Sequence, residues 1–118
     1  MELKWITLRV KNMVLAKAFY EEYLGLPCVR MFSPAPDMQI AFFKAENGME
    51  IELIESVKIP VQRIQGVSMG IETTKYDDLL LKSRQAGILE GEPQLLGGNL
   101  ECFMITDPDG MGIQVIRK

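Results

Sequence analysis

The chain has 118 residues, of which 47% are hydrophobic and 25% charged, the balance of a single ordinary globular domain. The net charge is −3, and basic residues never cluster, so the charge pattern typical of nucleic-acid-binding proteins is absent. No apolar stretch is long enough to cross a bilayer, and the N-terminal residues lead into no signal-peptide core. We therefore expect a cytoplasmic protein with no nucleic-acid or membrane partner.

Histidine is missing from the sequence, and this excludes several classes of site. Ser-His-Asp triads, Cys-His pairs and HExxH zinc sites all require it. The two cysteines, Cys28 and Cys102, lack CxxC spacing and predict two reduced core thiols rather than a disulfide or a metal site. Any chemistry must therefore use carboxylates, hydroxyls, thiols or lysine.

The first half of the chain predicts a strand, a helix and three further strands. Residues 5–10 alternate as a strand, and residues 13–24 carry a helical apolar stripe that ends at Gly25. A strand at residues 29–32, a loop at 33–37 and a strand at 38–45 follow. The dipeptide Asn47-Gly48 then predicts a hairpin turn, because both residues tolerate positive φ. The expected helical stripe consists of Met13, Ala16, Tyr20, Tyr23 and Leu24.

The second half repeats this order after a linker at residues 57–66. Residues 68–73 predict a strand, and Thr74 with Asp77 resembles a weak capping box for the next helix. That helix ends at Gly87, and two further segments, residues 87–99 and 100–106, precede the turn at Asp109-Gly110. Its predicted inner face consists of Tyr76, Leu79, Leu80 and Ser83.

An internal repeat supports this parallel. Segments 47–54 and 109–116 align with glycine, methionine and two isoleucines in register. Each half therefore reads as a βαβββ module, the first at about residues 1–56 and the second at about 67–118. A module of about 60 residues buries too little apolar surface to be stable alone, so we expect one domain with a shared core.

Four short motifs resemble one known family. Leu8-x-Val10, Phe19-Tyr20, Leu24-Gly25-Leu26 and Asp107-Pro108-Asp109-Gly110 are similar to motifs of the vicinal oxygen chelate superfamily. This superfamily includes glyoxalase I, bleomycin-resistance proteins, fosfomycin-resistance enzymes and extradiol dioxygenases. The resemblance implies an α+β fold in which two tandem βαβββ modules form a curved eight-stranded mixed sheet around a cavity, with helices on its convex side. It also implies a homodimer.

The resemblance places metal ligands on the first and last strand of each module. The matching positions are Trp5, Glu52, Ser68 and Gln114, although a shift of one residue would put Val67 in place of Ser68. Only Glu52 is a plausible ligand, and one carboxylate gives a divalent metal too few donors. We therefore predict a site with no metal and no cofactor.

Strand alternation predicts the lining of the cavity. If Trp5 and Glu52 face it, so do other residues of the same parity, while apolar neighbours such as Leu8 and Leu53 face the helices. Trp5 either stacks on a ligand or fills the space left by the metal. Arg9 either anchors a ligand anion or forms a salt bridge to Glu50, Glu52 or Glu72. The predicted ligand-binding residues are Trp5, Thr7, Arg9, Phe42, Glu50, Glu52, Ser68, Glu72, Met104 and Gln114.

This mixed lining suits a small organic molecule. The leading interpretation is a metal-independent binding protein of the bleomycin-resistance type that holds a hydrophobic or cationic organic ligand in the sheet cavity. One alternative is a metal-free glyoxalase-like lyase or isomerase with Glu52 as general base, the substrate oxyanion being met by Arg9, Ser68 or Gln114. A second alternative is a dimeric structural or regulatory domain with a vestigial pocket.

Overall fold

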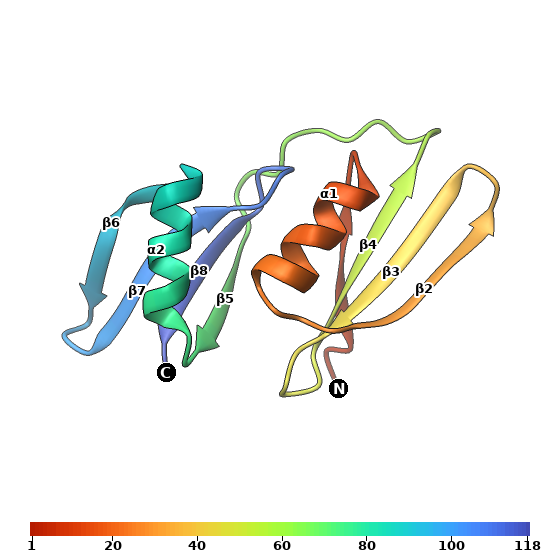
Figure 1. Cartoon of the computed structure of the whole chain (residues 1–118). Coiled ribbons are helices and arrows are strands. Elements are labelled where there is room, and N and C mark those ends of the chain that lie inside the picture. The colour runs from red at the N-terminus through yellow and green to blue at the C-terminus, as the bar shows by residue number, and fades with distance from the viewer. The chain divides into compact units, whose positions relative to one another are not determined.

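The structure is a computed structural model that describes residues 1–118. The chain divides into two compact units, Met1–Gln62 (unit 1) and Arg63–Lys118 (unit 2), and each contains one helical layer on a four-stranded mixed sheet (Figure 1). The element order confirms the predicted α+β fold of tandem βαβββ modules. None of the helices combines the length and the hydrophobicity that a membrane-spanning segment needs. The elements of unit 1 are β1 (Trp5–Arg9), α1 (Met13–Lys17), η1 (Ala18–Tyr23), β2 (Cys28–Ala35), β3 (Met38–Lys44) and β4 (Glu50–Ser56); those of unit 2 are β5 (Ser68–Thr73), α2 (Tyr76–Ala86), β6 (Leu89–Leu96), β7 (Leu100–Thr106) and β8 (Gly112–Arg117).

The sheet of unit 1, sheet 1, has the strand order β1-β4-β3-β2. β1 runs parallel to β4, with Trp5 opposite Glu50 and Thr7 opposite Glu52, and the other pairs are antiparallel. The sheet of unit 2, sheet 2, has the equivalent order β5-β8-β7-β6, again with only its first pair parallel. Both modules therefore place their first and last strands side by side at the same position in the sheet.

The first helix begins where the sequence predicts but changes its winding. The Asn12 side chain accepts a hydrogen bond from the Leu15 amide at 3.1 Å and caps the helix. After Lys17 the helix continues as the π-helical segment η1, whose wider turns lead to the bond from the Leu24 amide to the Phe19 carbonyl. This change of winding buries Phe19, and Tyr23 and Leu24 are only half-buried, so the predicted stripe is wrong at its C-terminal end.

The predicted loop at residues 33–37 is also wrong in extent. β2 continues through Ser33 and Pro34 to Ala35, and only residues 36–37 form the turn to β3. Proline fits here because β2 is an edge strand, where a missing amide proton removes no bond from an interior ladder.

Helix α2 lacks the predicted capping box. Its N-cap residue is Lys75, which has no capping side chain, and Thr73 Oγ1 instead accepts a hydrogen bond from the Lys75 amide at 3.0 Å. Gly87 ends the helix with a φ of 70°, as expected for a left-handed C-terminal residue. Of the predicted inner face, Tyr76, Leu79 and Ser83 are buried and Leu80 is half-buried.

The two glycine turns close the equivalent hairpins of the two units. Gly48 and Gly110 have φ values of 91° and 90°, whereas no residue other than glycine has a positive φ. In each turn the positive φ is therefore adopted by the glycine, and Asn47 and Asp109 do not use this conformation.

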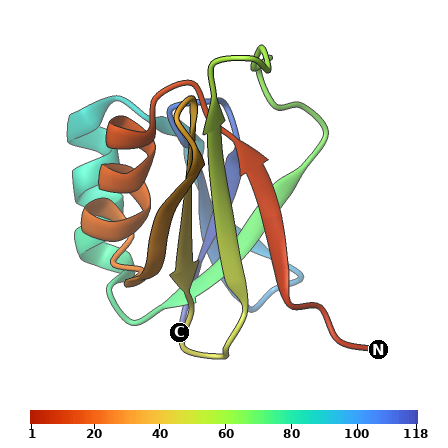
Figure 2. The same cartoon turned by 90° about the vertical axis from the view of Figure 1, so that its right-hand side faces the viewer.

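Each unit packs its helix against one face of its own sheet. In unit 1 the buried residues between the two layers include Leu8, Ala16, Tyr20, Phe43 and Leu53. Figure 2 views sheet 1 from its edge, with α1 on one side of the strands. The other face of each sheet, called here the distal face, points away from the helix of that unit.

Candidate functional site

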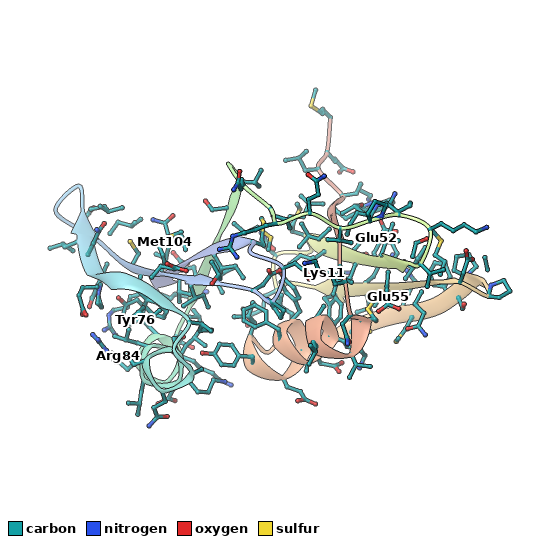
Figure 3. All side chains as sticks on the ribbon, turned by 90° about the horizontal axis from the view of Figure 1, so that it is seen from above. Lys11, Glu52, Glu55, Tyr76, Arg84 and Met104 are labelled. Carbon is teal, nitrogen blue, oxygen red and sulfur yellow. The ribbon has the colours of Figure 1, made fainter.

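The distal face of sheet 1 carries aromatic and charged side chains. Cross-strand register places Trp5 and Glu50 in one row and Thr7, Glu52 and Phe42 in the next. Figure 3 shows Glu52 on the face of sheet 1 opposite α1, whereas Glu55 lies on the α1 side. There the Glu55 carboxylate accepts a hydrogen bond from the Met13 amide at 2.5 Å.

Trp5 and Phe42 form the apolar centre of this face. Their ring centroids are 5.4 Å apart and the rings meet edge to face at 85°. Phe42 is only 5% exposed, whereas Trp5 is 48% exposed. The indole is thus held from one side by a buried ring and leaves much of its own surface accessible.

Arg30 joins this cluster from the edge strand. Its guanidinium lies 4.2 Å from the centroid of the Phe42 ring and also forms an ion pair of 2.9 Å with Glu50. Arg30 was missed because no face was predicted for the residues of this strand, and a register shift between Cys28 and Arg30 also interrupts the alternation of β2. Arg30 is opposite Phe42 in the register and therefore lies on the same face of sheet 1 as Phe42.

The second carboxylate of this face, Glu52, is hydrogen-bonded to Thr7, its neighbour on β1. Thr7 Oγ1 donates a hydrogen bond to Glu52 Oε1 at 2.5 Å. Arg9 is exposed and forms no ion pair with Glu50 or Glu52, so the predicted salt bridge to these two residues is not found. Glu52 is therefore oriented by a hydroxyl group, and the Arg9 guanidinium remains available.

A hollow of about 790 Å³ opens at the end of sheet 1 where the chain begins. It is lined by residues 2–5, residues 47–50, Arg30 and Lys44, and is called here the N-terminal hollow. Figure 2 shows the N-terminal segment and the β3–β4 turn at this same end of the sheet. Lys44, opposite Glu50 in the register, was also missed, although counting in steps of two from Phe42 along β3 would have found it.

The distal face of sheet 2 has a different character. Register places Ser68 beside Gly112 and Gly70 beside Gln114, and Met104 lies beside Gln114 on its other side. Gln114 Nε2 lies 3.4 Å from the buried Cys102 sulfur and donates to it. In Figure 3 Met104 lies on the side of sheet 2 away from α2, which carries Tyr76 and Arg84. Glu72, the remaining predicted lining residue of this unit, is exposed.

Comparison with known families identifies the fold. Residues 2–115 match the profile of the Glyoxalase/Bleomycin resistance protein/Dioxygenase superfamily. The chain belongs to this superfamily. No curated protein sequence matches it.

Solved structures with the same fold are similar over nearly the whole chain. A glyoxalase I mutant from Zea mays has a TM-score of 0.84 at 20% identity, and the superposition covers 98% of this chain and 44% of the Zea mays chain. Leishmania major glyoxalase I, described as trypanothione-dependent, has a TM-score of 0.79 at 18% identity, covering 99% of this chain and 86% of its own. The fosfomycin resistance protein FosX from Listeria monocytogenes has a TM-score of 0.79 at 17% identity, covering 98% and 91%. These identities support a common fold and nothing finer.

The residues at the positions where the resemblance places metal ligands supply few donors for a divalent metal. Trp5 offers an indole and Ser68 a hydroxyl group. Gln114 offers a neutral amide, which donates a hydrogen bond to Cys102. Glu52 offers the one carboxylate, which accepts a hydrogen bond from Thr7. No group of three or more His, Cys, Asp or Glu residues is arranged to hold a metal ion. Structural and catalytic metal sites need more charge and more donors than this set supplies.

The motif Asp107-Pro108-Asp109-Gly110 has a structural role in this member of the superfamily. Asp107 Oδ1 accepts hydrogen bonds from the amides of Asp109 and Met111, both at 2.8 Å. These bonds stabilise the turn between β7 and β8. The motif therefore marks a structural feature of the fold and not a reactive group.

Proposed function

We propose that this glyoxalase-superfamily chain is a metal-independent binding protein of the bleomycin-resistance type, which holds a small planar organic ligand against Trp5. The observation that carries the proposal is the half-exposed indole, fixed edge-on by the buried Phe42 ring on the face away from α1. A ring that is already ordered loses little conformational entropy when a second aromatic group stacks on it.

The sequence suggested a hydrophobic or a cationic ligand, and the contacts on sheet 1 favour the first. A cationic ligand beside Trp5 would need a free carboxylate there, but Glu50, which lies opposite Trp5 in the register, is paired with Arg30. Displacing Arg30 would also remove the guanidinium from the Phe42 ring. We therefore expect planar apolar or aromatic molecules to bind better than cations.

A thermal-shift screen of planar aromatic compounds on chelator-treated protein tests this function. A ligand that binds only the folded state raises Tm by mass action, and at a hundred times Kd it contributes about 2.7 kcal/mol. We expect hits that stabilise the native chain and lose their effect in Trp5→Leu, with Leu95→Ala, at an exposed position of β6, as the control. A screen without hits, or hits that require an added divalent metal, would contradict the proposal.

A second candidate function rests on Glu52. Its carboxylate is held on the distal face by Thr7, as a general base of a metal-free lyase or isomerase would need to be, and the unpaired Arg9 lies on the same face. Glu52→Gln keeps the hydrogen bond from Thr7 but cannot accept a substrate proton. If a substrate is found, this variant should abolish turnover and retain binding, whereas unchanged turnover would exclude the mechanism.

The third interpretation, a dimeric structural or regulatory domain, predicts a pocket closed by bulky side chains. The N-terminal hollow of about 790 Å³ and the accessible Trp5 support a binding function instead. The homodimer and the cytoplasmic location remain predictions. Sedimentation at several protein concentrations tests the first of these.

A further inference from the structure

We infer that the N-terminal hollow selects planar aromatic carboxylates, and that Lys44 is the residue that recognises their charge. The inference rests on the proposed function, because the ligand ring is taken to lie on Trp5, and it names the class of ligand. It follows from the charges that line the hollow.

Those charges leave one cation without a partner. The basic residues are Lys4, Arg30 and Lys44, and the acidic ones are Glu2 and Glu50. Glu2 lies 3.7 Å from Lys4, and Glu50 lies 2.9 Å from Arg30, so both carboxylates are already neutralised. Lys44 is exposed and forms no ion pair. The hollow therefore has an excess positive charge located on the Lys44 ammonium.

The position of Lys44 matches a ligand that stacks on Trp5. In the register Trp5, Glu50 and Lys44 form one row across β1, β4 and β3. Adjacent strands lie about 4.8 Å apart, so the backbones of Trp5 and Lys44 are separated by roughly 10 Å, the reach of a bicyclic aromatic acid plus a lysine side chain. Arg9, four residues along β1 from Trp5, lies roughly 13 Å away along the strand and suits the ligand less well.

Arg30 supports this selection without supplying the free charge. Its guanidinium is held between the Phe42 ring and Glu50, which orders the wall of the hollow beside Trp5. A carboxylate near Lys44 gains from the free charge of this ammonium group, whereas an ammonium group on the ligand would be repelled by it. The same ring without a charge should bind with intermediate affinity.

An NMR titration with three ligands of one ring system tests the inference. The probes are naphthoate, naphthylmethanol and naphthylmethylamine, and the signal is the indole Nε1–H of Trp5, the single tryptophan of the chain. We expect naphthoate to bind about fivefold more tightly than the alcohol, since an exposed charge pair contributes up to about this factor, and the amine to bind most weakly.

Two lysine variants separate charge recognition from ring binding. Lys44→Met should reduce naphthoate affinity to that of the alcohol and leave the alcohol unchanged. Lys58→Met, which removes an exposed lysine paired with Asp37 beyond the far end of β4, should alter neither. Equal binding of acid and alcohol, or an unchanged preference in Lys44→Met, would overturn the inference and leave the proposed function intact. No shift of the indole signal with any probe would overturn both.

Discussion

The distal faces of the two sheets differ far more than their backbones do. Both modules pair a first strand in parallel with a last strand in the same register, so four positions of one correspond to four positions of the other. In sheet 1 these positions hold Trp5, Thr7, Glu50 and Glu52, and in sheet 2 they hold Ser68, Gly70, Gly112 and Gln114. Two modules of one fold can thus keep the same strand pairing while only one of them carries the indole of Trp5 and the carboxylates of Glu50 and Glu52 at these positions.

The glycines of sheet 2 sharpen this difference. A Cβ atom at Gly112 would meet the Ser68 Cβ at 3.3 Å, so the close packing there favours glycine. At Gly70 a Cβ atom would meet its nearest neighbour, Ile116, at 3.6 Å, an ordinary contact. At Ser68, Gly70 and Gly112 sheet 2 therefore presents backbone and short side chains, whereas the equivalent positions of sheet 1 carry Trp5, Thr7 and Glu50.

The largest expected effect comes from equivalent core residues, one in each unit. Leu53 and Val115 are both fully buried, and Leu53→Ala and Val115→Ala should each lower the free energy of unfolding by about 2 to 3 kcal/mol. Urea denaturation followed by Trp5 fluorescence, which reports on unit 1, checks this. If the modules share one core as predicted, Val115→Ala shifts this transition too, and an unshifted transition would mean that unit 1 unfolds on its own.

The two turn glycines should differ in their tolerance of alanine. Both have a φ near 90°, a conformation that costs an alanine about 1 to 2 kcal/mol. A Cβ atom at Gly48 meets nothing within 4 Å, whereas one at Gly110 would lie 2.7 Å from Arg63 Cγ. Gly110→Ala should therefore destabilise the protein more than Gly48→Ala does. Thermal unfolding of the two variants measures the difference, and equal losses would show that Arg63 moves aside freely.

A smaller effect is expected at Tyr76 in unit 2. Its hydroxyl is buried without a hydrogen-bond partner, and the same burial raises the pKa of the phenol. Tyr76→Phe removes this unsatisfied group and keeps the ring that packs against Phe103 at 4.9 Å. We expect the variant to be as stable as the native chain or more stable by about 1 kcal/mol. A clear loss of stability in urea denaturation would contradict this account.

The smallest effects concern two ion pairs, of which one is half-buried and the other exposed. A hydrogen bond from Lys17 lowers the pKa of Glu21 in unit 1, and hydrogen bonds from Arg117 lower the pKa of Asp77 in unit 2. A lowered folded-state pKa contributes stability above the unfolded-state pKa of about 4, which is lost as the pH falls through the folded-state value. Glu21→Gln and Asp77→Asn should each reduce stability slightly at neutral pH and converge on the native chain in acid. An equal loss at both pH values would exclude the ionic cause.

The sequence predicted most of the fold because its signals are local. Strand alternation, the glycine turns and the internal repeat specify the eight strands, and β5 and β7 have the bounds expected for them. The winding of η1 and the extent of β2 could not be predicted, since both depend on packing and edge position rather than on neighbouring residues. On the distal face of sheet 1, Phe42 contacts Trp5 and lies opposite Glu52, whereas Arg30 lies beside a register shift in β2 that no local pattern in the sequence marks.

We propose that a planar ligand rests on the Trp5 face of sheet 1 without a metal. Backbone amide shifts of chelator-treated protein, titrated with naphthoate, test it most directly. We expect saturable shifts of the Trp5 indole and of the amides of β1, β3 and β4, with the same Kd before and after chelation. Shifts confined to β5–β8, or shifts that appear only when a divalent metal is added, would contradict it.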